Sequence, residues 1–184
     1  MFDILDLHEL EYLSNKVHQN AVDKGFWDED RPINHCILLV VCEVCEVIEA
    51  DRKGLRAQDL TVFKQFSKEG FATMYKYMVK DSVEDELADV LLRLLDIIAW
   101  RKWPLAEWIN SYNRDYVKDK SFAEVCYRLI ELLVNRVDGD AFAVVNAVYF
   151  VLSIADRAGI NLIKHAKMKM IYNKNRPQLH GKIY

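Results

Sequence analysis

Glycine and proline are scarce in this chain, with six glycines and three prolines among its 184 residues. Almost no stretch alternates apolar and polar residues as a half-buried strand does. The chain therefore lacks both the turn residues and the periodicity that sheets require, and we expect an all-α fold. With 52% hydrophobic residues it is long enough to bury one full core, so residues 1–184 are expected to form a single domain.

Long apolar runs and a strong charge of either sign are also missing. The longest uncharged apolar candidate, residues 141–155, falls short of the roughly 18 residues that a membrane span needs, so we expect no membrane partner. A net charge of −3 does not suggest the basic surface that binds a nucleic-acid polymer, so we expect no such partner. Four acidic residues among the first dozen argue against a signal peptide, and we expect a cytoplasmic protein.

The four cysteines do not suggest a disulfide framework in a chain of this size. Cys42 and Cys45 form a CxxC pair, but no second pair and no HxxxH partner follows it. Because both lie in an apolar helical run, we predict that they are small core residues.

Apolar residues recur at helical spacing through most of the chain, and Gly25, Gly54 and Gly159 fit helix ends. The predicted helices cover residues 5–24, 35–53, 55–81, 84–100, 105–118, 122–137, 141–158 and 162–172. The third has a weak point near Gly70. The seventh is apolar nearly all round and should be central or at a subunit contact. We expect a helical bundle with four core helices plus additional C-terminal helices.

The predicted helix 84–100 carries an unusually narrow polar stripe. Of the fifteen residues from 86 to 100, eleven are apolar, and the four charged ones, spaced by three or four, are Glu86, Asp89, Arg93 and Asp96. At about 100° per residue they occupy roughly 80° of the circumference, so most of this helix should be buried. Buried carboxylates require a partner, and a divalent cation is one such partner. The alternative is a partly exposed helix with ordinary Asp–Arg ion pairs.

A second acidic row lies on the predicted helix 35–53, where Glu43, Glu46 and Glu49 follow one another at steps of three on an otherwise apolar segment. Two helices of this kind in one domain predict that the two acidic rows face each other. None of the five histidines has a Glu three residues before it, so the Glu-x-x-His pattern of di-iron bundles is missing. An all-oxygen site suits hard Mg²⁺ or Mn²⁺.

The C-terminal part of the chain is basic. Residues 157–184 contain seven Lys or Arg and no Asp or Glu, and NKNRPQLHGK resembles a loop that cradles phosphate. The alternative is a solvated tail that balances the acidic rows. Carboxylates, Mg²⁺ and a basic segment together indicate phosphoryl chemistry, and because the chain has no P-loop, a helical metal-dependent hydrolase is favoured.

Glu43-Val-Cys-Glu46 followed by Glu86-Leu-Ala-Asp89 resembles the ExxE…ExxD signature of the MazG-like all-α nucleoside triphosphate pyrophosphohydrolases. The flanking segments EVCEVIEADRKG and EDELADVLLRLLDIIAW, the stretch NAVDKGFWD and the tail KMIYNKNRPQLHGKIY are also similar to members of that family. The 39 residues between Glu46 and Glu86 leave room for an extra helix.

The resemblance implies Mg²⁺-dependent conversion of a nucleoside triphosphate to the monophosphate and pyrophosphate, in a homodimer or homotetramer. It implies that the metal ligands are Glu43, Glu46, Glu86 and Asp89. Glu49 is an extra ligand or the base for the attacking water, and Arg93 and Asp96 support the ligands. The candidates for the triphosphate are Lys169, Asn173, Arg176, His180 and Lys182. The candidates for the nucleoside are Asn20, Lys24 and Trp27, with packing an equal alternative for Trp27.

Two other functions remain open. In the first, the chain is a non-catalytic scaffold or interaction protein whose carboxylates pair with Lys and Arg across helices. In the second, it is a related hydrolase that acts on phosphoribosyl-ATP.

Overall fold

The computed structural model describes residues 4–58, 68–108, 119–135 and 141–181, and every regular element within them is helical, which confirms the all-α prediction. The elements in chain order are α1 (Ile4–Asp23), α2 (Ile33–Arg52), α3 (Lys68–Met78), α4 (Val83–Arg101), α5 (Leu105–Trp108), α6 (Phe122–Val134), α7 (Ala141–Arg157), α8 (Leu162–Lys174) and the short turn η4 (Gln178–Gly181).

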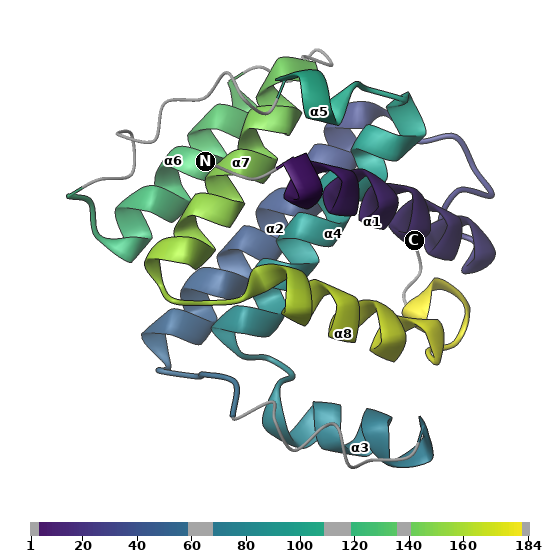
Figure 1. Cartoon of the computed structure of the whole chain (residues 1–184), viewed down its shortest axis with the longest axis vertical. Helices are drawn as coiled ribbons and strands as arrows, with labels where there is room; N and C mark the ends of the chain where they lie inside the picture. Colours follow the sequence, from purple (N-terminus) through teal and green to yellow (C-terminus); the bar gives the residue numbers. More distant parts are fainter. Residues whose placement is uncertain (1–3, 59–67, 109–118, 136–140, 182–184) are drawn as a thin grey trace.

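Helix α4 lies at the centre of the bundle, as Figure 1 shows. It packs against α1, α2, α7 and α8, while α6 lies against α7 and α2. Helix α3 lies at one end of the molecule and packs mainly on α8 (Figure 1). The arrangement is a bundle in which α1, α2 and α8 surround α4 and the α6–α7 pair extends the core.

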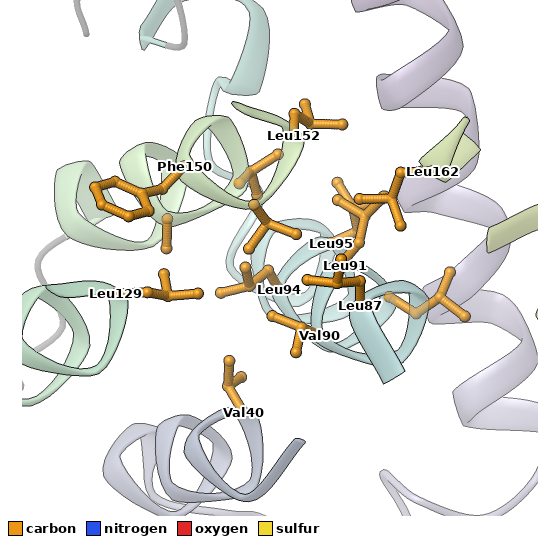
Figure 2. Packing of buried hydrophobic residues seen from close by; sticks show 14 of the residues in the cluster. Val40, Leu87, Val90, Leu91, Leu94, Leu95, Leu129, Phe150, Leu152 and Leu162 are labelled. Carbon is orange, nitrogen blue, oxygen red and sulfur yellow. The ribbon is translucent and has the colours of Figure 1, made fainter. Parts of the chain in front are cut away.

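The core forms around the apolar side chains of α4, which Figure 2 shows between α2, α6 and α7. Leu91 and Leu94 are fully buried, with Val40 of α2 on one side and Leu129 of α6 nearby. The helix begins where the Ser82 hydroxyl accepts a hydrogen bond from the backbone N–H of Asp85, which makes Ser82 its N-cap residue. The near-continuous apolar surface of α4 thus explains its central place.

Helix α7 is buried along most of its length, which places it in the core as its composition predicted. In the part of the chain that the structure describes, no single helix combines the length and apolar composition needed to cross a membrane. Helices α7 and α8 meet those criteria only as a pair, with a bend of 110° between them.

The predicted helix 55–81 was wrong in its first part. Residues 55–58 are not helical, because their backbone groups bond elsewhere: Gln58 N–H donates to Met78 O, and Leu55 O accepts from Val83 N–H. Helix α3 begins only at Lys68 and runs through Gly70 without a break. Residues 59–67 and 109–118, within two predicted helices, and 136–137 at the end of a third lie outside the described residues.

The prediction that Cys42 and Cys45 are core residues was also wrong, since both are exposed free cysteines. Helix α2 buries the face that carries Val40, Val44 and Val47, and the two cysteines lie on the face turned away from α4. The helix is apolar on both faces, so periodicity did not reveal which face is buried.

Candidate functional site

A cleft of about 350 Å³ opens between α1, α2, α4 and α8, with the segment 26–31 and the residues after α8 at its edges. Most of the side chains predicted from the sequence to bind metal or substrate line it, although they come from four separate parts of the chain. These are Asn20, Trp27, Glu43, Glu46, Glu86, Asp89, Lys169, Asn173, Arg176 and His180.

Three carboxylates from two helices meet in this cleft. Each of Glu43, Glu86 and Asp89 offers one oxygen, and these oxygens all lie within 4.8 Å of one another. We call these three residues the acidic cluster. The packing of α2 on α4 brings them together, so the two acidic rows do face each other where Glu43 meets Glu86 and Asp89.

Glu86 is the most unusual member of the acidic cluster. It is only 5% exposed, and no hydrogen bond or ion pair from a described residue reaches its carboxylate. Burial, followed by the negative charge of Asp89, raises its pKa to about 8. A buried carboxyl group without a protein partner, facing a cleft, is typical of a group that binds a ligand.

Glu43 is paired with a basic side chain of the same stripe as Glu86. Its Oε1 accepts a hydrogen bond from Arg93 Nε at 2.5 Å. Burial raises the pKa of Glu43 in spite of the guanidinium. Burial lowers the pKa of the Arg93 guanidinium, but the charges of Glu43 and the other nearby carboxylates raise it by more. Arg93 therefore stays charged and orients Glu43 within the cluster.

Asp89 is paired with Lys169 of α8. Lys169 Nζ lies 2.6 Å from Asp89 Oδ2 and 2.9 Å from both carboxylate oxygens of Asp85. The Tyr75 hydroxyl donates a hydrogen bond to Asp85 Oδ1, and the Asp81 backbone N–H donates to Oδ2 at 3.1 Å. Burial opposes the charge of Lys169, yet Asp89 and Asp85 raise its pKa. The ammonium is thus a permanent charge beside the acidic cluster.

Asp81, Asp85 and Glu86 form a second group of oxygens close enough to hold a metal. Both oxygens of Asp85 are already occupied by protein donors, and Asp81 is exposed and pairs with Lys80. The acidic cluster is therefore the better candidate for a cation. Its donors are all carboxylate oxygens, which suits a hard divalent ion such as Mg²⁺.

The other end of the cleft is aromatic. The Trp27 indole N–H donates to both oxygens of Asp96, at 3.1 and 3.2 Å, and His18 Nδ1 lies 2.7 Å from Asp96 Oδ1. The Trp27 ring packs on Trp100, with centroids 4.6 Å apart. Burial raises the pKa of Asp96 although both partners lower it. Trp27 is thus fixed in place by Asp96 and still lines the cleft.

The segment after α8 is fastened to the end of α1. Lys24 Nζ donates to Arg176 O at 2.6 Å, and Leu179 N–H donates to Lys24 O at 2.9 Å. Gly25 has φ of +78°, a backbone conformation that favours glycine, and it lies beside the Gln178 side chain of this segment. Arg176 Nη2 donates to His180 O at 3.1 Å. These bonds place two basic side chains, Arg176 and His180, at the cleft.

Two of the predicted site residues that the structure describes, Glu49 and Lys24, do not line the cleft. Glu49 is exposed and pairs with Arg52 and Lys53. It lies on another side of α2 from Glu43, because residues three apart lie about 60° apart around a helix and Glu49 is two such steps away. Lys24 holds the segment after α8 instead. Lys182 lies outside the described residues. Glu46 lines the cleft but is exposed.

Sequence reasoning missed Tyr75, Asp85 and His18. Asp85 stands beside Glu86 in a helix, where adjacent residues face different directions, so it lies off the acidic stripe. Tyr75 is one of several apolar residues in its segment. Only the packing of α3 and α8 against the start of α4 shows that they meet.

Comparison of the chain with protein-family models, with curated proteins and with solved structures found no match. The geometry of the cleft therefore stands as the basis for a functional proposal.

Proposed function

We propose that this protein is a Mg²⁺-dependent nucleotide pyrophosphohydrolase of the MazG-like type, which hydrolyses a nucleoside triphosphate to the monophosphate and pyrophosphate. The observation that carries the proposal is Glu86, a buried carboxylate that no described residue pairs with, in a three-carboxylate cluster on a cleft. The resemblance of the ExxE…ExxD motifs to that family gives the reaction type.

The residues present fit a divalent cation. Glu43, Glu86 and Asp89 would hold it, with Glu46 at the open side of the cleft as a further ligand. When bound, Mg²⁺ supplies charge that polarises a phosphate and lowers the pKa of a water. In the reaction, the water oxygen bonds to the α-phosphorus, the bond to the bridging oxygen breaks, and pyrophosphate leaves.

The remaining parts of the cleft suit the remaining parts of a nucleotide. Arg176 presents a positive charge and His180 a ring nitrogen to the β- and γ-phosphates, and Asn173 offers an amide beside them. Trp27, held by Asp96, offers an aromatic surface near Asn20 for the nucleoside. Arg93 and Lys169 orient Glu43 and Asp89 through their ion pairs.

Pyrophosphate release from a panel of nucleoside triphosphates, with Mg²⁺ and with Mn²⁺, tests the proposal. We expect turnover with at least one nucleotide and none in EDTA. Glu86→Gln and Asp89→Asn should each reduce kcat by at least about 100-fold, because each removes a charged metal ligand. The matched control is Glu49→Gln, a change of the same chemistry on α2 outside the cleft, which should keep wild-type activity. Wild-type rates in Glu86→Gln would refute the site assignment.

A non-catalytic scaffold is the second candidate, because Arg93–Glu43 and Lys169–Asp89 are the cross-helix ion pairs that such a protein would use. Thermal unfolding with and without Mg²⁺ separates the two. A scaffold gains no stability from the ion, whereas the unfolding free energy of the hydrolase rises with the logarithm of the ion concentration above Kd. Phosphoribosyl-ATP belongs in the substrate panel as the other hydrolase substrate that the sequence leaves open.

A further inference from the structure

The ammonium of Lys169 lies inside the bundle beside the acidic cluster, and the residue is only 4% exposed. It contacts three carboxylate oxygens, at 2.9 Å twice on Asp85 and at 2.6 Å on Asp89. An ammonium has three hydrogens to donate, so these contacts use its full capacity. Lys169 therefore acts on the site through charge rather than through a donor directed at a ligand.

A buried set of contacts keeps the ammonium there. Tyr75 and Asp85 are both fully buried, and the Tyr75 hydroxyl donates to Asp85, whose other oxygen accepts from the Asp81 backbone. The Tyr75 ring stacks on Tyr172, with centroids 4.7 Å apart and an angle of 17° between the planes. If Lys169 moved away, Asp85 would be a buried carboxylate without a counter-charge, which is strongly unfavourable.

The charges around the cluster limit how many cations fit. The ionisable groups in mutual contact, within the cluster or beside it on the cleft are Glu43, Glu46, Asp85, Glu86, Asp89, Arg93 and Lys169. With these five carboxylates and two cations all ionised, three negative charges remain, and one divalent cation reduces them to one. A second divalent cation would leave surplus positive charge in a buried region, which is costly.

We propose that Lys169 is a built-in cation of the acidic cluster, so that the substrate-free protein takes up one divalent ion and the ammonium stands in place of a second. This inference rests on the proposed metal site, and it adds the number of divalent ions that one chain binds. Tyr75 and Asp85 are positioning residues for the ammonium. Any further ion would then arrive with the negatively charged substrate.

The number of bound ions is measured by titrating Mn²⁺ into the substrate-free protein, with free Mn²⁺ followed by electron paramagnetic resonance. Wild type should bind one ion per chain. Lys169→Met keeps the length of the buried side chain and removes its charge, and it should bind two. Lys164→Met, on the exposed side of the same helix, is the matched control and should bind one.

A second measurement does not depend on metal. Reductive methylation followed by mass spectrometry should leave Lys169 unmodified in the wild type while exposed lysines such as Lys16 react. Tyr75→Phe keeps the ring and removes the hydrogen bond to Asp85, and it should raise the labelling rate of Lys169 roughly tenfold, as expected for losing one hydrogen bond to a charged group.

The outcomes separate this inference from the proposed function. Two ions in the wild type, one ion in a folded Lys169→Met, or rapid labelling of wild-type Lys169 would each overturn the inference alone. No bound ion in the wild type would overturn both. If Lys169→Met fails to fold, the wild-type count and the labelling of Tyr75→Phe still decide the matter.

Discussion

Replacing Glu86 with glutamine should stabilise the metal-free protein at neutral pH. Burial and the charge of Asp89 raise the pKa of Glu86 from 4.5 to about 8. The folded state therefore binds a proton on Glu86 that the unfolded state has released. The stability that this proton contributes is fully present below about pH 4.5 and is lost as the pH rises towards about 8. Glutamine resembles the protonated form at every pH.

The size of the effect follows from the same shift. Each pH unit above the unfolded pKa costs the wild type about 1.4 kcal/mol until the folded pKa is reached. At neutral pH the variant should therefore exceed the wild type by about 3 kcal/mol in unfolding free energy. For a chain of this size, that difference raises Tm by roughly 6 to 12 °C.

Denaturant unfolding in EDTA, followed by circular dichroism between about pH 5 and about pH 8, measures the effect. The two proteins should have similar stability at the acid end and diverge as the pH rises. Glu49→Gln, at an exposed position on the acidic row of α2, should stay within about 0.5 kcal/mol of the wild type throughout. Saturating Mg²⁺, at about 100 times its Kd, should add about 2.7 kcal/mol to the wild type and much less to Glu86→Gln.

Parallel pH dependences for wild type and Glu86→Gln would show that the carboxyl group is solvated or paired in solution. The reasoning that makes Glu86 a ligand-binding group would then be refuted.

Three further substitutions test how the site is built. Leu94→Ala leaves a cavity in the middle of α4 and should lower the unfolding free energy by about 2–5 kcal/mol in denaturant titration. Ser82→Ala removes the acceptor for the Asp85 backbone N–H and should cost about 1 kcal/mol by the same measurement, with a gain in stability contradicting the capping role. Asp96→Asn removes the charged acceptor of the Trp27 indole and should cost about 1–3 kcal/mol and change the tryptophan emission, whereas an unchanged spectrum would show that this contact is not made.

The helices and the meeting of the acidic rows were predictable from the sequence because both depend on local periodicity. Eleven apolar residues of fifteen in residues 86–100 are enough to bury a helix on nearly every side, and α4 is the central helix. Carboxylates at steps of three on two apolar helices then have few places to lie except opposite one another, and Glu43 meets Glu86 and Asp89.

What the sequence did not reveal depends on long-range packing. Lys169 lies 80 residues from Asp89 and was predicted to bind phosphate, but its ammonium is directed at carboxylates of α4. Glu49 was grouped with Glu43 on spacing alone. Residues three apart lie about 60° apart around a helix, so two such steps place Glu49 at the surface. Tyr75 carries no local signal, because its role arises from the docking of α3 on α8.

Helix α3 rests on the rest of the molecule through a small cluster of its own, formed by Tyr75, Val79, Met168 and Tyr172 and separate from the main core. So few apolar contacts give a segment a lower opening free energy than the bundle. Backbone amides of α3 should accordingly exchange with solvent well before those of α4. The Lys169 ammonium would then stay fixed only while α3 remains docked. Substitutions on the solvent side of α3 would therefore change the acidic cluster without altering any residue of the cleft.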